Sequence, residues 1–360
     1  VENAADANST KVWNGVFENA FYKVEFNEKM QLTSLIEKTS GQEMLKENRV
    51  GNELVTYEDR PMNWDGWDID FYYKKKPYEA DEVSVPQLLE DGPVRTVLGI
   101  MHKFADSTIT QEIILYKGLP RIDFKTKADW REHNVLLRVN FPADVNSTKA
   151  SYEIQFGNVE RETTANHSWD TAKFEVCGHK WADLSDNGAG LSLLNDCKYG
   201  YSVRDGEMGL TLIKAGTYPN ANADIGEHEF TYSIYPHSGR WMEAQTVEMA
   251  YDLNVPMLAV VSDRQALCED GNGEWGFLTV KDKNCFVEMI KQAEDGNGYI
   301  LRVYENQNKR TNTEYRLAVA PKAVRECDLL EQDLHEISIE GNTFTDCIKP
   351  FEIKTYRLIF

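Results

Sequence analysis

The chain has 360 residues, a length that corresponds to one large domain or two ordinary ones. It carries 39 Lys and Arg against 59 Asp and Glu, and the resulting net charge of −20 disfavours binding to nucleic-acid backbones and anionic membrane surfaces. Hydrophobic residues make up 41% of the chain, which is enough for a sizeable core, and no apolar run approaches the roughly 20 residues of a membrane helix. We therefore expect a folded protein with no nucleic-acid and no membrane partner.

Apolar and polar residues alternate with a period of two in many short segments, a pattern typical of strands with one buried face. In chain order these segments are 22–26, 122–130, 135–141, 154–156, 210–212 and 230–234, and an apolar run predicts a further strand at 257–261. Turn-forming Gly, Asn, Asp and Pro separate the segments, for example at 91–93, 205–206, 270–273 and 295–298. Helical patterning is limited to about one turn at 44–47 and at 326–334. We predict an all-β protein with a large antiparallel β-sandwich over residues 1–245 and a smaller β domain over residues 246–360.

The N-terminal residues and the spacing of the cysteines both bear on the cellular compartment of the protein. Residues 1–10 are polar and acidic, unlike a signal peptide, and the chain does not begin with Met, so we expect a processed product or a fragment. No two cysteines form a C-x-x-C pair, which favours reduced thiols and a cytoplasmic location for Cys177, Cys197, Cys268, Cys285, Cys327 and Cys347.

The common catalytic signatures are missing from the sequence. There is no phosphate-binding G-x-x-x-x-G-K-[ST], no G-x-G-x-x-G, no G-x-S-x-G and no H-E-x-x-H. The seven histidines show no short-range spacing typical of metal ligands, so we expect no metal and no cofactor in this chain.

Residues 63–70 form the most unusual segment, with two tryptophans and three aspartates around one glycine. An indole face stacks on the C–H side of a pyranose, and carboxylates accept hydrogen bonds from its hydroxyls. This composition predicts a substrate-binding loop made of Trp64, Asp65, Trp67 and Asp68, although the same residues would also suit a loop that is merely anchored to a sandwich.

Two further segments supply secondary candidates. Residues 166–185 and 194–200 combine histidines, tryptophans and carboxylates, a set that can hold a cation or polarise a hydroxyl, and the candidates there are His179 and Asp183. His228 follows in the segment 224–228, just before a clean strand pattern. The alternative for all three is that they are polar groups satisfied within or between loops.

At these segments the sequence resembles the C-terminal region of family 38 glycoside hydrolases, the α-mannosidases, in the branch of cytosolic and vacuolar enzymes and their bacterial relatives. The resemblance is carried by motifs in the family's order over most of the chain, among them E-D-R-P and W-D-G-W-D. The matching stretches are residues 17–19, 52–54, 58–61, 64–68, 91–95, 129–130, 152–157, 169–170, 174–185, 198–200, 224–228, 230–232, 236–239, 301–305, 329–331 and 350–353.

The resemblance implies a large sandwich of the galactose-mutarotase-like type followed by a small β domain. In the family, the zinc ligands and the nucleophilic aspartate belong to an N-terminal domain marked by an early His-x-Asp. No histidine of this chain is followed at the second position by Asp, so the resemblance implies a non-catalytic portion. Its expected partners are a zinc-dependent catalytic domain of the same polypeptide and terminal α-mannosides or oligosaccharides, hydrolysed with retention. Homo-oligomerisation stays open.

Two other classes of protein remain as alternatives. A free-standing mutarotase-like epimerase would need an acid–base pair, drawn from His179 or His228 with Glu175 or Glu229. A carbohydrate-binding module would need an exposed aromatic platform, for which Trp64, Trp67 and Trp181 are the candidates.

Overall fold

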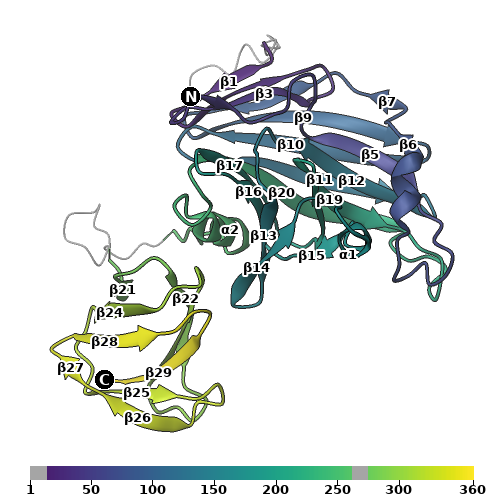
Figure 1. The fold of residues 1–360 in the computed structure, drawn as a ribbon. Helices are drawn as coiled ribbons and strands as arrows, with labels where there is room; N and C mark the ends of the chain where they lie inside the picture. The colour runs from purple at the N-terminus through teal and green to yellow at the C-terminus, as the bar shows by residue number, and fades with distance from the viewer. Residues whose placement is uncertain (1–13, 262–274) are drawn as a thin grey trace. The chain divides into compact units, whose positions relative to one another are not determined.

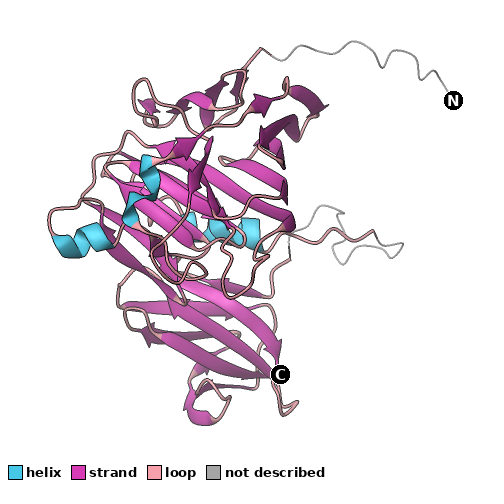
Figure 2. Ribbon diagram, turned by 90° about the vertical axis from the view of Figure 1, so that its right-hand side faces the viewer, coloured by secondary structure: helices cyan, strands magenta, loops and turns pink. Residues whose placement is uncertain are grey.

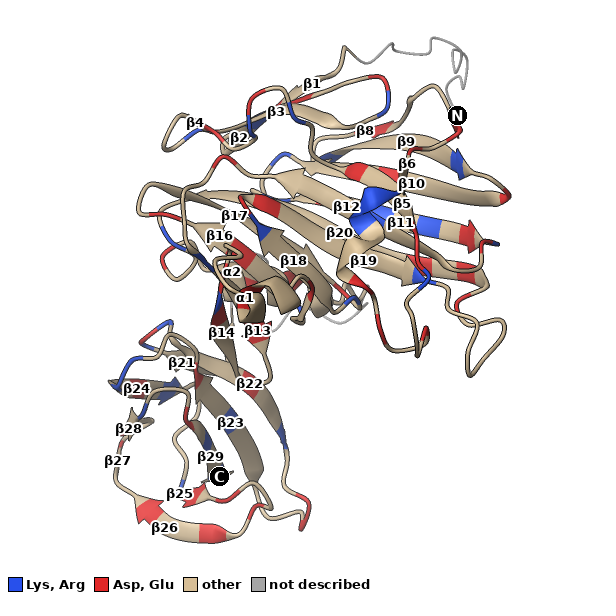
Figure 3. Cartoon of the chain, turned by 45° about the vertical axis from the view of Figure 1, so that its right-hand side comes forward, with Lys and Arg blue, Asp and Glu red and all other residues tan. Residues whose placement is uncertain are grey.

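Strands dominate the computed structural model, which describes residues 14–261 and 275–360 (Figures 1 and 2). The chain forms two compact units. The first comprises the described residues up to Glu153 together with Glu160–Pro256, and the second comprises Ile154–Val159 and Met257–Phe360. Within the described residues, no helix is long and apolar enough to cross a membrane. Asp and Glu are distributed over the strands and loops of both units (Figure 3).

Two large antiparallel sheets form the first unit. The ten-stranded sheet has the order β14-β13-β16-β17-β20-β11-β10-β9-β7, and β8 also pairs with β9. Its strands are β7 (Glu82–Val83), β8 (Gln87–Asp91), β9 (Arg95–Phe104), β10 (Ser107–Tyr116), β11 (Ile122–Trp130), β13 (Lys149–Ile154), β14 (Gly157–Glu162), β16 (Trp181–Ser185), β17 (Ala189–Asn195) and β20 (Gly226–Ser238). The six-stranded sheet, in the order β15-β18-β19-β12-β5-β6, contains β5 (Glu53–Glu58), β6 (Pro77–Tyr78), β12 (Val135–Pro142), β15 (Val176–Cys177), β18 (Gly200–Arg204) and β19 (Glu207–Lys214).

The core of the first unit lies between these two sheets. The ring of Phe141 on β12 packs 5.9 Å from Phe124 on β11 and 6.3 Å from Tyr232 on β20. All three side chains are buried, and the Tyr232 hydroxyl donates to Asn52 and accepts from Gln111 at 2.6 Å each. The apolar face of each strand thus meets the other sheet, as the alternation of period two requires.

Smaller elements complete the first unit. A four-stranded sheet precedes the sandwich and consists of β1 (Val16–Glu18), β2 (Tyr22–Phe26), β3 (Leu32–Glu37) and β4 (Gln42–Glu43). The helices are η1 (Phe71–Lys75), a 3₁₀ turn, α1 (Ser168–Ala172) and α2 (Thr246–Asn254). Helix α2 packs against β16 and β17 and thereby covers part of the outer face of the ten-stranded sheet (Figure 1).

The second unit is a smaller sandwich of two antiparallel sheets. One sheet, in the order β21-β24-β28-β27, contains β21 (Leu278–Val280), β24 (Thr311–Leu317), β27 (Ile339–Glu340) and β28 (Thr343–Ile348). The other, in the order β22-β23-β29-β25-β26, contains β22 (Cys285–Gln292), β23 (Tyr299–Glu305), β25 (Ala323–Cys327), β26 (Asp333–Ile337) and β29 (Ile353–Ile359). Its core combines aliphatic side chains with an aromatic cluster, in which the Tyr315 ring lies 4.6 Å from Phe344 in the same sheet and 5.4 Å from Tyr356 in the facing sheet.

The all-β prediction is confirmed, with a large sandwich and a smaller β unit. Four local predictions are wrong. Residues 154–156 end β13 and enter a turn, in which Phe156 has a φ of +54°. Residues 257–261 form no strand and expose their apolar side chains, because a strand needs a neighbouring strand as well as an apolar sequence. No helix forms at 44–47, and 326–334 spans the end of β25, a turn and the start of β26.

The first unit continues to Pro256, because α2 packs on its sheet, whereas the sequence pattern suggested a boundary after Gln245. Most of the predicted turn at 270–273 and Cys268 lie outside the described residues. The other cysteines are free thiols: Cys177, Cys197, Cys285, Cys327 and Cys347.

Candidate functional site

The candidate site is the loop of residues 61–70 between β5 and η1, here called the Trp loop. It contains a tight turn in which the amides of Trp67 and Asp68 both donate to the carbonyl oxygen of Trp64, at 2.7 and 2.9 Å. Trp64 itself has a φ of +58°, a left-handed conformation that is unfavourable for a bulky side chain. Such strain persists only where surrounding contacts enforce it, and it often marks a functional position.

Asp65 supplies those enforcing contacts. Its carboxylate accepts hydrogen bonds from the amide and hydroxyl of Thr217, at 2.7 and 2.8 Å, and from the amide of Tyr218 at 3.0 Å. The Nδ2 amide of Asn134 donates to the same carboxylate at 3.3 Å. The Thr217 amide and hydroxyl hold the pKa of Asp65 below its ordinary value, because they stabilise the charged form. Asp65 therefore anchors the Trp loop to the segment 214–218.

Backbone contacts bring the same two segments close together. A Cβ atom on Gly66 would lie 2.5 Å from the carbonyl oxygen of Tyr218, and one on Gly216 would lie 2.7 Å from that of Asp65. Lys214 adds a cation to this contact, with its Nζ 2.5 Å from Asp59 and 2.6 Å from the carbonyl oxygen of Asp65. Any side chain at Gly66 would therefore force one of the two segments to move.

The tryptophans of the loop remain open to solvent. Trp64 is 61% exposed and Trp67 is 65% exposed, and their rings meet edge to face at 6.0 Å. Asp68 is also exposed. Other large apolar side chains are also exposed, in the loop, directly after it and in the segment that binds Asp65. They are Met62, Phe71, Tyr72 and Tyr218. An anchored loop with two exposed indoles and one exposed carboxylate has the groups that could stack on a sugar ring and accept hydrogen bonds from its hydroxyls. Of the four predicted residues, Asp65 is the one whose carboxylate is already used internally.

The three secondary candidates do not form one site. The His179 ring lies 5.0 Å from that of Tyr199, before β16. Asp183 is buried on β16 and accepts from His237 and two serines. His228 lies on β20 opposite Ala128 of β11, and its Nε2 is 2.8 Å from the carbonyl oxygen of Asp224. Asp183 and His228 thus have hydrogen-bond partners within the first unit.

The acid–base pairs of an epimerase are not assembled around the two glutamates. Glu175 bonds with the buried Arg138 and accepts from the Thr211 hydroxyl at 2.7 Å. Glu229 faces Lys125 and Lys127 at 3.4 and 3.7 Å. Both carboxylates are thus paired with cations, and neither of them is hydrogen-bonded to His179 or His228, as an acid–base pair would require.

The aromatic platform of a binding module is only partly present. Trp64 and Trp67 are exposed as that alternative requires, but Trp181 is 1% exposed and packs 5.0 Å from the Trp241 ring. Trp181 is therefore a core residue, and its inclusion in a platform is wrong.

Sequence reasoning missed the partners that hold the Trp loop. Thr217 and Lys214 lie some 150 positions from it, and no spacing connects the two segments. The Gly216–Thr217 pair was a weak signal, since a glycine beside a strand end often allows close backbone approach. Across residues 14–261 and 275–360, no three His, Cys, Asp or Glu side chains lie together in a way that would hold a metal ion.

The fold defines a class of protein: an all-β region made of a large sandwich and a smaller one, with an exposed Trp–Asp loop on the first. The chain belongs to glycoside hydrolase family 38. The family model described as "Glycosyl hydrolases family 38 C-terminal domain" matches residues 17–222, and the one described as "Glycosyl hydrolases family 38 C-terminal beta sandwich domain" matches residues 284–356. These matches confirm the resemblance seen in the sequence motifs.

Curated relatives agree with this assignment. The chain is 37% identical to "Alpha-mannosidase G" of Dictyostelium discoideum, over 96% of its own length and 32% of that protein. It is 36% identical to "Alpha-mannosidase 2C1" of Homo sapiens, over 95% of its own length and 33% of that protein. The chain thus spans about a third of the length of the curated relatives it matches.

A solved structure has the same fold. A glycosyl hydrolase family 38 protein from Enterococcus faecalis superposes with a TM-score of 0.77 at 16% identity, covering 95% of this chain and 44% of that one.

Proposed function

We propose that this chain is the non-catalytic C-terminal portion of an α-mannosidase that hydrolyses terminal α-mannosides with retention. The observation that carries the proposal is the match of nearly the whole chain to one third of α-mannosidases. Two carboxylates perform this chemistry, and a zinc ion held by the catalytic portion binds sugar hydroxyls. We assign the ligands of that zinc to the N-terminal catalytic portion; in the part of this chain that the structure describes, no three His, Cys, Asp or Glu side chains lie together as a metal site would require. We place the enzyme in the cytoplasm, where the free thiols of this chain would stay reduced.

The role proposed for this portion is to brace the catalytic domain and to form one wall of its sugar pocket with the Trp loop. Trp64 and Trp67 would stack on the mannoside, and Asp68 would accept a hydroxyl. Asp65 would act as a positioning residue, because its hydrogen bonds to Thr217 and Tyr218 fix the turn that presents the indoles. The exposure of both tryptophans on an anchored loop supports this role.

Kinetic measurements on the full-length enzyme test whether the Trp loop contributes to the sugar pocket. Asp68→Asn should lower kcat/KM by about 10- to 150-fold, since a hydrogen bond to a charged group contributes about 1.5–3 kcal/mol. Trp67→Ala should act in the same direction, and both variants should keep the melting temperature, because these side chains are exposed. Trp275→Ala, which removes an exposed tryptophan of the second unit, is the matched control. Unchanged kcat/KM in Asp68→Asn and Trp67→Ala would show that the loop serves folding alone.

An activity assay on the 360-residue chain alone tests whether this portion is non-catalytic. The purified 360-residue chain should not hydrolyse an aryl α-mannoside, with zinc or with cobalt added, because the nucleophile lies in the catalytic portion. Turnover that disappears when one of this chain's own carboxylates is replaced would refute the proposed function.

A further inference from the structure

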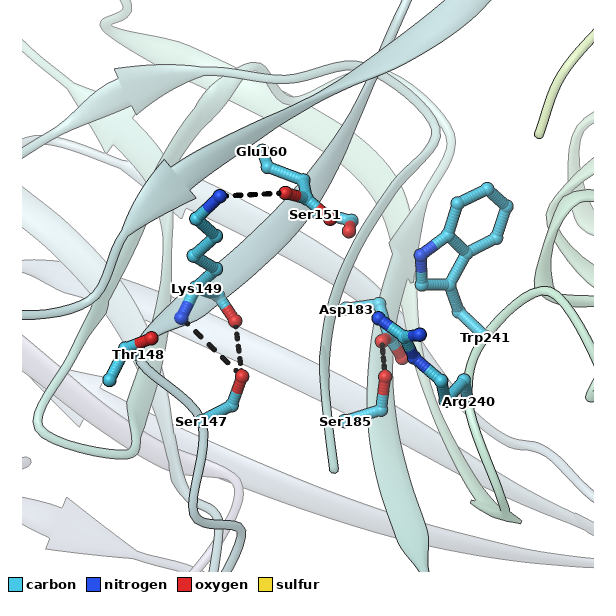
Figure 4. Close-up of a pocket in the computed structure, with 9 residues that line it drawn as sticks. All are labelled: Ser147, Thr148, Lys149, Ser151, Glu160, Asp183, Ser185, Arg240 and Trp241. Atoms are coloured by element: carbon cyan, nitrogen blue, oxygen red, sulfur yellow. Dashed lines mark hydrogen bonds and ion pairs between the residues drawn. The ribbon is translucent and has the colours of Figure 1, made fainter. Parts of the chain in front are cut away.

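A polar pocket opens on the outer face of the ten-stranded sheet, within the first unit. It has a volume of about 310 Å³. Strands β13, β14 and β16 and the segments next to them supply Ser147, Thr148, Lys149, Ser151, Glu160, Asp183 and Ser185, and the turn after β20 supplies Arg240 and Trp241 (Figure 4). A hexose ring fits a cavity of this size. We call it the polar pocket.

Strand register explains why polar groups collect on this face. Ser151 of β13 pairs with Asp183 of β16, which pairs in turn with Ser192 of β17. Paired residues of neighbouring strands point to the same face of a sheet, and residues two apart, such as Asp183 and Ser185, do so as well. The opposite face carries Ala182 and Leu184, which are buried in the sandwich core.

Asp183 is fixed in place before any ligand arrives. It is 1% exposed, and its Oδ2 accepts from Ser192 at 2.8 Å and lies 2.9 Å from Nε2 of His237. Its Oδ1 accepts from Ser185 at 2.7 Å. The Ser192 hydroxyl is in turn 2.9 Å from that of Thr246 on α2. A carboxylate held by three donors keeps one orientation, and Oδ1 retains a lone pair for a further donor.

Two donors that line the polar pocket, Arg240 and Trp241, complement this acceptor. Arg240 is exposed, and its guanidinium has no hydrogen-bond partner among the described residues. The indole nitrogen of Trp241 points toward the other labelled side chains in Figure 4, and its ring packs 5.0 Å from that of Trp181. The polar pocket is therefore lined by one buried acceptor, Asp183, by two donors, Arg240 and Trp241, and by several hydroxyls.

The charge balance selects the class of ligand. Lys149 lies 3.1 Å from Glu160, and Arg240 is matched in charge by Asp183, so the polar pocket has no net positive charge to favour an anion. Serine and threonine hydroxyls both donate and accept, as do the hydroxyls of a sugar. We propose that the polar pocket binds one neutral hexose unit, a site separate from the Trp loop. This inference rests on the pocket alone and not on the proposed function.

The test follows one indole signal of the 360-residue chain by NMR. Methyl α-D-mannopyranoside is titrated into protein labelled at the tryptophan indole nitrogens, and the Trp241 signal should shift in a saturable manner. Trp241→Phe assigns the signal. If Trp241→Phe does not fold, the Trp241 signal is assigned from Arg240→Ala instead, as the indole signal whose position differs most from that of the parent protein.

Three variants locate the binding. Arg240→Ala should weaken the Kd by about tenfold or more, the effect of losing a hydrogen bond to a charged group. Arg316→Ala, which removes an exposed arginine of the second unit, should leave the Kd unchanged. Trp67→Ala should leave the Trp241 titration unchanged as well, because it alters the Trp loop only. The proposal is overturned by a Trp241 signal that does not respond to the sugar, by one that responds to inorganic phosphate instead, or by equal Kd values in Arg240→Ala and Arg316→Ala.

Discussion

The Trp loop and the polar pocket both combine tryptophan with aspartate, yet the two aspartates are held by different groups. Asp65 accepts from the backbone and side chain of Thr217, so it ties one loop to another near the surface. Asp183 accepts from His237 and two serines on the same face of a sheet, and it is buried. In both places the carboxylate holds the structure, and only Asp183 is proposed to keep a lone pair, on Oδ1, for a ligand.

This difference indicates where removal of a carboxylate should cost most. Unpaired donors are expensive in the interior, where water cannot replace the lost acceptor, and less so near the surface. Asp183 should therefore control the stability of the first unit, whereas Asp65 should mainly control the conformation of the Trp loop.

The largest expected effect is that of Asp183→Ala. It leaves His237, Ser185 and Ser192 without their acceptor and should lower the free energy of unfolding by about 3–5 kcal/mol. Urea unfolding followed by tryptophan fluorescence measures it, because Trp275 is the one tryptophan of the eight that belongs to the second unit. Asp106→Ala, at the exposed turn between β9 and β10, serves as the control. Equal losses in both variants would contradict the assignment of Asp183 as a buried anchor.

A smaller effect is expected when a side chain is added where the backbone of the Trp loop meets the segment 214–218. Gly66→Ala places a Cβ 2.5 Å from the carbonyl oxygen of Tyr218, so one of the two segments must move, at about 1–3 kcal/mol in the free energy of unfolding. Gly118→Ala is the matched control, because a Cβ there meets nothing within 4 Å. Identical urea midpoints for the two variants would mean that the Trp loop is not tightly held against 214–218.

The smallest effect is the pH dependence contributed by Asp65. Its pKa is lowered in the folded protein, so it contributes stability above the ordinary aspartate pKa of 3.8 and loses that contribution as the pH falls through the lowered value. The difference in melting temperature between the parent chain and Asp65→Asn should therefore shrink below about pH 4. A difference that stays constant from pH 6 to pH 3 would show that the charge of Asp65 does not matter to the anchor.

Much of the fold follows from local sequence, and the exceptions have identifiable causes. The predicted strands 22–26 and 122–130 coincide with β2 and β11, because alternation of period two is a property of the segment itself. The apolar run 257–261 shows the limit of this reasoning, since its composition suits a strand but no neighbouring strand pairs with it. Likewise, Phe156 continues the alternation of β13 but lies in a turn.

The sequence by itself determined the all-β class, the family and the composition of the Trp loop, because each depends on residues close together along the chain. Only the tertiary structure decided which aspartates are anchors and which are available. That distinction depends on Thr217 for Asp65 and on His237 for Asp183, partners that lie 152 and 54 positions away. Hydrogen bonds at such separations are created by the pairing of strands and the meeting of loops. No local pattern encodes them, and for this reason the sequence could not tell that Asp65 is hydrogen-bonded within the protein whereas Asp68, three residues further on in the same motif, is exposed.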